Sequence, residues 1–224
     1  TALNALTGKK GISKFRGSIL YSPLVSCKLV PSIHPAYLLH GSEDGDEGAS
    51  FKYSTRVYMQ LDFNRAVEES KFKEYHPPSR HIQIIKDSYS LYKFLENFKD
   101  HKRFALDIET IKSIPVCIGI APSSLFAVSI QMLNIPEAGY TIPYQELAEM
   151  YRLLSNFLGS DNKEWIGQNW KFDQQKLETV FGMRMIPPYA DTMLLSSIVN
   201  PEFPKNLQFL CSIYSREPFY KDEG

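Results

Sequence analysis

The sequence has few cysteines and no long apolar segment. Its three cysteines, Cys27, Cys117 and Cys211, are far apart and odd in number, which excludes a disulfide framework and the regular spacing of a zinc site. No apolar run reaches the roughly 18 residues that a membrane-spanning helix needs, and no charged-then-apolar signal sequence is present. We therefore expect a protein of the reducing cytoplasm with no membrane partner.

An excess of charge of either sign is also missing. The 224 residues carry 25 basic and 25 acidic side chains, so total charge predicts no strong nonspecific hold on nucleic acid. The composition is 43% hydrophobic and 13% aromatic, enough to bury a core in one large domain or two small ones. Internal repeats and low-complexity tracts are absent as well, and the composition does not resemble that of a disordered chain.

The most informative stretch is Arg103–Thr110, RFALDIET, an apolar run that carries two acids. Because strand side chains alternate between faces, Asp107 and Glu109 are predicted to share one face of a strand end. Leu106 and Ile108 then turn inward. Two neighbouring carboxylates repel unless a cation lies between them, and Mg²⁺ or Mn²⁺ prefers oxygen ligands. The pattern favours a metal site, with a strand that ends in solvated acids as the simpler alternative.

A second motif supplies a third acid. Residues 166–173 read IGQNWKFD, and Asp173 lies 64 positions (173 − 109) after Glu109. The stretch EWIGQN is typical of a short strand, and KFDQQKLETVFG is typical of the start of a helix. Asp173 is therefore predicted to project from a strand-to-helix junction, where it can meet the first two carboxylates. This motif makes the metal site the preferred interpretation.

The order and spacing of these motifs resemble a known family. ALDIET followed by GQNWKFD is similar to the first two motifs of the DEDD-type 3′-5′ proofreading exonuclease attached to family A DNA polymerases of phages and bacteria. The run Tyr189–Leu195, YADTMLL, resembles the segment that follows the second motif, and the resemblance covers roughly residues 80–224. It implies a ribonuclease-H-like α/β fold, a mixed sheet with flanking helices. It also implies a bacterial or phage-infected cell and a C-terminal polymerase domain in the full chain.

The resemblance further implies a reaction, the hydrolysis of the 3′-terminal phosphodiester of single-stranded DNA with two divalent ions, Mg²⁺ or Mn²⁺. Asp107 would bridge both ions. Glu109 would bind the ion that carries the attacking water, and Asp173 would help to hold the second ion.

The other residues of the second motif are candidate substrate contacts. The resemblance implies that Asn169 contacts the terminal nucleotide and that Lys171 and Phe172 fix the motif. An aromatic side chain at a strand end can stack on a base or belong to the core, and Trp170 is open to both interpretations.

One motif of the resembled family is missing. This motif is Tyr-x-x-x-Asp, whose Asp completes the metal site and whose Tyr orients the water. No such string follows Asp173, because Asp191 and Asp222 are each preceded at four residues by a proline. The last residues, EPFYKDEG, resemble the segment shortly upstream of that motif in phage polymerases, and the chain starts at Thr1 inside an expected helix. We therefore expect a truncated fragment with little or no turnover of its own.

Two alternatives to an exonuclease follow from the same residues. The first is a catalytically silent DNA-binding or scaffolding module of a replication protein that keeps the fold. The second is a nuclease of the RNA-processing branch, which shares D-x-E with this sequence. The second motif, GQN-x-K-x-D, argues against that branch.

A domain boundary is predicted at Tyr75–Ser79, YHPPS, because each proline lacks an amide hydrogen and restricts the residue before it. The two domains are then residues 1–75 and 76–224. After the boundary we expect a strand at IQII, a helix capped by Ser88 or Ser90, the strand RFALDIET, and two antiparallel strands, VCIGIA and SLFAVSI. Helices are expected at QELAEMYRLLSNFL and at about 171–182, 190–200 and 205–215.

Residues 1–75 resemble the C-terminal portion of a uracil-DNA glycosylase, which implies a partial α/β unit. The matching words are ISKFRG at residues 12–17 and the P-x-x-H-P-x-x-L-L string of residues 31–39. The resemblance implies that His34 bonds to a flipped uracil, while the water-activating group would lie upstream of Thr1. A histidine before a proline is otherwise a turn or cap residue.

Within residues 1–75 the elements follow from turn-forming and β-branched residues. We expect a helix that ends at Gly8, a strand or hairpin at residues 11–24, and a strand followed by a helix that begins at Pro35. The acidic segment His40–Tyr53 is expected to be a solvated loop. A strand at Arg56–Leu61 and a helix at about residues 64–73 complete the domain.

Overall fold

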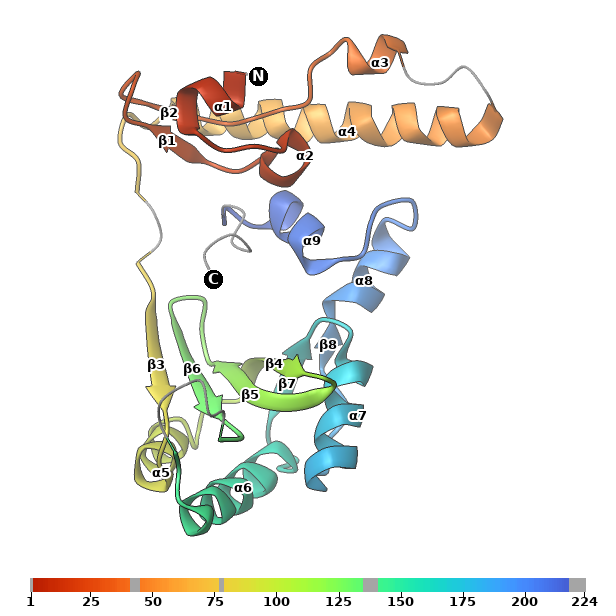
Figure 1. The fold of residues 1–224 in the computed structure, drawn as a ribbon. Helices are drawn as coiled ribbons and strands as arrows, with labels where there is room; N and C mark the ends of the chain where they lie inside the picture. Colours follow the sequence, from red (N-terminus) through yellow and green to blue (C-terminus); the bar gives the residue numbers. More distant parts are fainter. Residues whose placement is uncertain (1, 41–44, 77–78, 135–140, 218–224) are drawn as a thin grey trace. The chain divides into compact units, whose positions relative to one another are not determined.

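The chain divides into two compact units. The computed structural model describes residues 2–40, 45–76, 79–134 and 141–217 (Figure 1). One unit combines Thr1–Pro78 with Ser196–Gly224, and the other is Ser79–Leu195. The division after Pro78 falls inside the predicted boundary segment, whereas Ser196–Gly224 belongs to the N-terminal unit rather than to the sheet. The assignment of residues 1–75 and 76–224 to two domains therefore stays a prediction.

The unit Ser79–Leu195 is built on a six-stranded mixed sheet in the order β3-β6-β5-β4-β7-β8. β4, β5 and β6 are antiparallel neighbours, while β3 pairs in parallel with β6, and β7 is parallel to both β4 and β8. This helix-flanked sheet confirms the predicted ribonuclease-H-like α/β fold. The strands are β3 (His81–Ile85), β4 (Arg103–Ile111), β5 (Ile114–Ala121), β6 (Phe126–Gln131), β7 (Glu164–Gly167) and β8 (Ala190–Asp191). The helices are α5 (Ser88–Asn97), α6 (Tyr144–Leu158), α7 (Trp170–Phe181) and α8 (Thr192–Val199), in which the chain leaves this unit.

β4 and β5 form a hairpin that places the first two acids. Both residues of the connecting turn, 112–113, have positive φ values of 50° and 68°, as in the two-residue turns that match the twist of a hairpin. The register pairs Asp107 with Gly119 and Glu109 with Cys117. Because paired residues point to the same face of a sheet, the two acids lie beside small side chains of β5.

An aromatic cluster joins the strands that carry the two motifs. Phe104 of β4 is in register with Trp165 of β7, and their ring centroids are 5.6 Å apart. Phe157 of α6 lies 5.2 Å from the first ring and 5.5 Å from the second, a range in which each aromatic pair adds about 0.5–1.5 kcal/mol. α5 and α6 pack side by side (Figure 1), and they bury their apolar faces in the same core.

The start of α5 differs from the prediction in one detail. Its N-cap is Asp87, whose Oδ1 accepts a hydrogen bond from the Ser90 amide at 2.7 Å. The Ser88 hydroxyl instead donates to the Glu146 carboxylate of α6 at 2.9 Å. The prediction that Ser88 or Ser90 caps the helix was therefore wrong. Asp87 is the cap, and the Ser88 hydroxyl links α5 to α6 instead.

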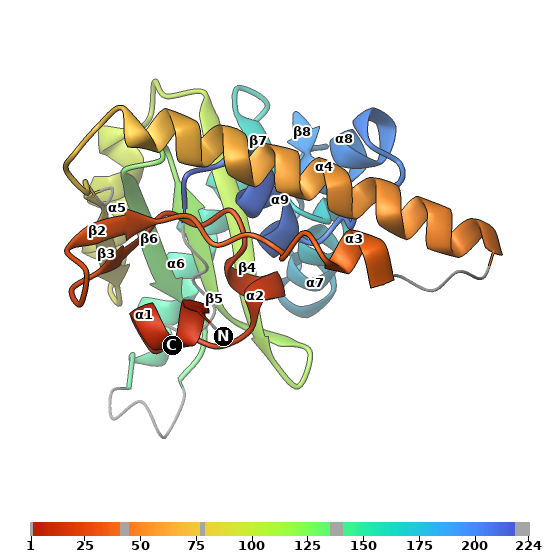
Figure 2. The same cartoon turned by 90° about the horizontal axis from the view of Figure 1, so that it is seen from above.

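The N-terminal unit combines a two-stranded sheet with helices. Its elements are α1 (Ala2–Thr7), α2 (Ile12–Phe15), β1 (Leu20–Ser22), β2 (Cys27–Leu29), α3 (Tyr37–His40), α4 (Gly45–Ser70) and, from the end of the chain, α9 (Leu207–Tyr214). β1 and β2 pair in antiparallel orientation. Residues 11–24 were predicted as a strand or hairpin, and they contain α2 followed by the single strand β1, whose partner β2 is the strand predicted after them. α9 lies beneath α4 when the molecule is seen from above (Figure 2). Although α4 has 26 residues, neither it nor any other described helix is long and apolar enough to span a membrane.

Two predictions for this region were wrong. The strand at Arg56–Leu61 is part of α4, and so is the acidic segment from Gly45 onward, while residues 41–44 lie outside the described residues. The buried positions of this stretch include Thr55, Met59 and Asp62, which share one side of a helix at spacings of four and three residues. Two of the three are polar, so apolar periodicity alone did not reveal the helix.

A buried ionic network ties α9 to α4. The Arg16 guanidinium pairs with the Asp62 carboxylate, and both side chains are buried. Arg16 Nη1 also donates to the Ser212 hydroxyl at 3.0 Å. From α4, Arg65 donates to the carbonyl oxygens of Gly17 at 2.5 Å, Ser212 at 2.9 Å and Ile213 at 3.0 Å. Burial raises the pKa of Asp62 in spite of the bond from Arg16, so the network depends on every partner being in place.

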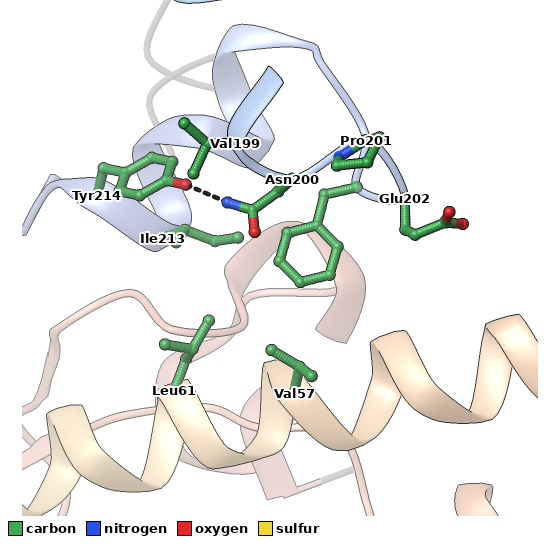
Figure 3. A pocket seen from close by; sticks show the side chains of 9 residues that line it. Val57, Leu61, Val199, Asn200, Pro201, Glu202, Ile213 and Tyr214 are labelled. Atoms are coloured by element: carbon green, nitrogen blue, oxygen red, sulfur yellow. Dashed lines mark hydrogen bonds between the residues drawn. The ribbon is translucent and has the colours of Figure 1, made fainter. Parts of the chain in front are cut away.

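The same unit contains a cavity of about 420 Å³ between α4 and the segment that leads into α9. Val57 and Leu61 point from α4 toward this segment, and the Asn200 amide donates to the Tyr214 hydroxyl at 2.7 Å across the far wall (Figure 3). Glu202 is the single carboxylate among the nine lining residues. The cavity is therefore a packing gap of the N-terminal unit and not an acidic site.

We predict that Arg65→Met releases the C-terminal segment. The substitution keeps the aliphatic stem but leaves three carbonyl oxygens without their donor, which should lower the free energy of unfolding by about 2–4 kcal/mol. Limited proteolysis should then cut within Leu207–Tyr214 faster than in the parent. Arg152→Met, which removes an exposed partner of Glu149 on α6, should leave the free energy of unfolding nearly unchanged, because solvent screens an exposed ion pair. Equal resistance of the Arg65 variant and the parent would contradict the assigned role.

Candidate active site

The first acidic pair lies where the sequence predicts. Asp107 and Glu109 are exposed on β4, while Leu106 and Ile108 are buried in the core on the opposite face. The β4–β5 register shifts between Glu109 and Thr110, which marks a bulge directly after the second acid. Alternation along one strand thus accounts for the exposure of both carboxylates.

The third acid reaches this pair from α7. Asp173 lies in the first turn of the helix, is only 3% exposed, and its Oδ2 has no hydrogen-bond partner among the described residues. Its pKa is raised to about 7, first by burial and then by the charges of Asp107, Asp191 and Glu109. These charges raise the pKa only because the carboxylates are close together. Asp173 therefore lies within range of the charges of both predicted acids of β4 and also of Asp191.

The junction between β7 and α7 is tightly packed. Asn169, the N-cap of α7, has φ 60° and ψ 46°, in the left-handed region that asparagine tolerates better than most residues. A Cβ atom at Gly167 would lie 2.7 Å from a ring carbon of Trp170, so only glycine fits there. Trp170 is 2% exposed and stacks on Trp165 at 6.3 Å. It is a core residue, and the base-stacking alternative does not hold.

The remaining predicted residues differ in position. Lys171 is exposed, and Phe172 is 40% exposed with the Lys176 ammonium 5.6 Å from its ring centroid. His34 belongs to the other compact unit. It is exposed, and its Nδ1 accepts a hydrogen bond from the Ala36 amide at 3.1 Å, which is the geometry of a turn residue.

Asp191 is the residue that sequence reasoning did not assign to the site. It is 7% exposed, and its carboxylate accepts hydrogen bonds from the amides of Asn169, Trp170 and Met193. The sequence feature that could have revealed it is the YADTMLL segment. The resemblance of this segment to the family did not assign a function to its aspartate.

The acids Asp107, Glu109 and Asp173 are ligands of the kind that a hard divalent cation prefers, but they do not surround a single point. All three are carboxylates, and one buried oxygen of Asp173 lacks a hydrogen-bond partner among the described residues, which fits a cation ligand. In the described part of the chain, however, no group of three or more His, Cys, Asp or Glu side chains is arranged to hold an ion. Like charges without a counter-ion repel each other, so these acids need a cation or a further ligand to close around one point.

We predict an unusual pH dependence without divalent ions. Because the pKa of Asp173 rises from 3.8 to about 7 on folding, the native state holds a proton that the unfolded chain releases between these values. The stability from this group is present at low pH and is lost as the pH rises from about 4 to 7, by roughly 4 kcal/mol. In Asp173→Asn this loss should disappear, which makes the variant more stable than the parent at pH 8. Urea unfolding in a chelator, with the exposed Asp161→Asn as control, measures the difference. An unchanged pH profile would contradict the assigned pKa.

A second prediction concerns the junction. Gly167→Ala forces the Trp170 ring to move, which should lower the free energy of unfolding by about 1–3 kcal/mol. Gly119→Ala is the matched strand glycine, since its Cβ would meet only the Asp107 carbonyl oxygen at an ordinary 3.7 Å. That control should be neutral or stabilising by up to about 1 kcal/mol. Equal denaturation midpoints for the two variants would contradict the close packing.

Three solved structures show partial likeness to the chain. Escherichia coli RNase D, an exoribonuclease involved in structured RNA processing, has 16% identity over 64% of this chain and 36% of its own, with a TM-score of 0.48. Brucella melitensis NrnC with bound Mg²⁺ has 18% identity over 60% and 59%, with a TM-score of 0.40. The EXD2 exonuclease domain soaked in Mn and GMP has 17% identity over 52% and 58%, with a TM-score of 0.39.

Matches at the level of sequence are more informative. DNA polymerase I of Borreliella burgdorferi is 25% identical over 193 residues, which cover 83% of this chain and 19% of the polymerase. The chain thus spans about a fifth of that relative's length. An alignment over 83% of the chain cannot fit within residues 82–223, so it extends into the N-terminal residues as well. Neither this match nor the family match supports the glycosylase-like interpretation of residues 1–75.

The family match covers both acidic motifs. The family model for 3′-5′ exonuclease spans residues 82–223, more than half of the chain, and includes β4, α7 and Asp191. By this match the chain belongs to the 3′-5′ exonuclease family.

Proposed function

We propose that the chain is the proofreading 3′-5′ exonuclease of a DNA polymerase and acts on the 3′ end of single-stranded DNA with two divalent ions, Mg²⁺ or Mn²⁺. The observation that carries the proposal is the position of Asp173, a buried acid of the second motif in the first turn of α7, whose Oδ2 has no hydrogen-bond partner among the described residues. Its pKa is raised by burial and also by the charges of Asp107 and Glu109, which supports a shared site for the two motifs. The polymerase match supports DNA as the substrate.

Asp107, Glu109 and Asp173 would hold the ions, which when bound would activate water and stabilise the leaving oxygen of the phosphodiester. The chain's own contribution is placement. β4 fixes two carboxylates on a strand that is held near its start by the packing of Phe104, and the first turn of α7 carries the third. Related exonuclease structures soaked in Mn or Mg support this choice of ion.

The residues around Asp173 would hold the substrate. Asn169 lies at the start of α7, next to the acids, and would contact the terminal nucleotide. Lys171 and Phe172 occupy the same helical turn and are exposed, so they remain accessible to a nucleic-acid strand. A lysine there adds positive charge beside a site that is otherwise negative.

We propose that a tyrosine and a fourth carboxylate from outside these residues complete the site, in a full chain that continues into a polymerase domain. The open arrangement of the acids supports this proposal, since the described residues form no closed group of three metal ligands. The same observation favours the second candidate function, a catalytically silent DNA-binding or scaffolding module.

The glycosylase-like role of residues 1–75 stays a prediction. His34 would have to recognise a base from an exposed turn in which its Nδ1 already accepts the Ala36 amide hydrogen. Excision of uracil by this chain is not part of the proposal, because a water-activating group would have to come from elsewhere.

The proposal predicts the effect of Asp107→Asn. In a version of the protein that continues through a Tyr-x-x-x-Asp, the parent should shorten 3′-labelled single-stranded DNA with Mn²⁺ and leave it intact with chelator. Asp107→Asn should lower the rate at least ~10²-fold, because it removes a charge that both ions would share. Calorimetry should show weaker Mn²⁺ binding by this variant, while the exposed Asp161→Asn behaves as the parent. If the extended parent binds Mn²⁺ and the DNA stays intact, the silent module is the correct interpretation.

A further inference from the structure

We propose that Asp191 is a positioning residue of the exonuclease site, which fixes the second motif so that Asn169 and Asp173 face the first acidic pair. The inference rests on the proposed function. It gives a role to the aspartate of YADTMLL, which the chemistry of the acidic motifs leaves unassigned.

The contacts of Asp191 lie at the start of α7. Its Oδ1 accepts hydrogen bonds from the amides of Asn169 at 3.0 Å and Met193 at 2.8 Å, and its Oδ2 accepts one from the Trp170 amide at 2.8 Å. The first amides of a helix have no partner within the helix, and a carboxylate at this end is favoured by the helix dipole. Asp191 lies 22 residues after Asn169. It accepts the hydrogen bonds from the first helical amides that an N-cap side chain normally accepts.

No local cap is made at this helix. The N-cap Asn169 is held in the left-handed region and makes no side-chain capping bond. An asparagine whose side chain does not cap its own helix remains available to a ligand, while the backbone strain of this conformation must be offset elsewhere. The two carboxylate oxygens of Asp191, which accept hydrogen bonds from the Asn169 amide and the Trp170 amide on either side of the Asn169 Cα atom, provide that offset.

β8 and the residue after Asp191 hold the same junction. Gly167 is in register with Asp191 in the parallel β7–β8 pair. The Thr192 hydroxyl contacts the Gly167 carbonyl oxygen at 3.1 Å and the Gln168 side-chain oxygen. Every residue from Gly167 to Trp170 is therefore bonded to β8 or to its direct continuation.

These contacts distinguish a positioning residue from a metal ligand. Asp191 is buried and its oxygens already accept three amide hydrogens, whereas the Asp173 oxygen has no partner among the described residues. Three hydrogen bonds to one carboxylate use most of its acceptor capacity. Asp191 therefore acts on the reaction through Asn169 and Asp173.

The chain contains an optical probe for this junction. Its two tryptophans, Trp165 and Trp170, stack on each other with ring planes 29° apart. One belongs to β7 and the other begins α7. The near-ultraviolet circular dichroism of the tryptophans should therefore change when α7 shifts relative to the strand.

The test is Asp191→Asn, which keeps the shape but replaces one acceptor oxygen by an amide donor. We expect amide exchange at Asn169 or Trp170 to become at least ~10-fold faster, and the tryptophan dichroism to change while the far-ultraviolet spectrum stays the same. In the protein extended through the third motif, kcat should fall at least ~10-fold with KM within about threefold of the parent. Asp161→Asn removes the same charge at an exposed turn and should leave all three measurements unchanged. Unchanged exchange and dichroism, or faster exchange with unchanged kcat, would overturn the proposal.

Two further measurements keep the outcome unambiguous. In the unaltered protein the Trp170 amide should exchange at least ~10-fold slower, relative to intrinsic rates, than the amide of Tyr144. Tyr144 is the first residue of α6, whose N-cap Pro143 makes no side-chain capping bond. Equal exchange would overturn the proposal even if the variant does not fold. Full activity of Asp107→Asn would instead refute the proposed function, and the exchange result would show separately whether Asp191 fixes the junction.

Discussion

The burial of one carboxylate, Asp173, near other acids is the constraint on which the sheet unit depends. Asp173 is enclosed by protein, has one oxygen without a partner among the described residues and faces acids on β4. A pKa raised from 3.8 to about 7 corresponds to roughly 4 kcal/mol of unfavourable interaction for the charged form, a large fraction of the 5–15 kcal/mol that typically separates folded from unfolded domains. The aromatic packing between β4 and β7 and the amide bonds of Asp191 stabilise the arrangement against this cost. Burial is the larger cause of this cost and the neighbouring acids the smaller one, and a cation bound at these acids would offset the part that comes from their repulsion.

Alternation and spacing predicted the part of the site that lies along continuous stretches of chain. Asp107 and Glu109 follow from the period of a strand, and Asp173 follows from a strand-to-helix change within eight residues. Asp191 could not be found in this way, because its strand has only two residues and its role depends on a parallel pairing with β7. A residue that acts by accepting backbone amides has no sequence pattern of its own, since every residue except proline offers an amide.

The N-terminal unit was less predictable for a related reason. Arg56–Leu61 is rich in residues that favour strands, yet it lies in α4, where the buried side includes Thr55 and Asp62. A buried aspartate requires a partner, and the partner here is Arg16, 46 positions earlier. Binary patterns of polar and apolar residues cannot reveal a helix whose buried face is polar and is satisfied by distant segments. The sheet unit has an apolar core, and its helices and strands were accordingly predicted with few errors.

The discontinuous make-up of the N-terminal unit has a consequence for biosynthesis. Chains emerge from the ribosome from the N-terminus onward, and units generally fold as they become complete. Residues 1–78 emerge first, but the hydroxyl and carbonyl groups of Ser212 and Ile213 that Arg16 and Arg65 bind emerge more than a hundred residues later. The sheet unit Ser79–Leu195 is continuous in sequence, so it can fold before Ser212 and Ile213 are synthesised. Within these residues, the N-terminal unit therefore completes its hydrogen bonding only after the whole of the intervening sheet unit has been synthesised.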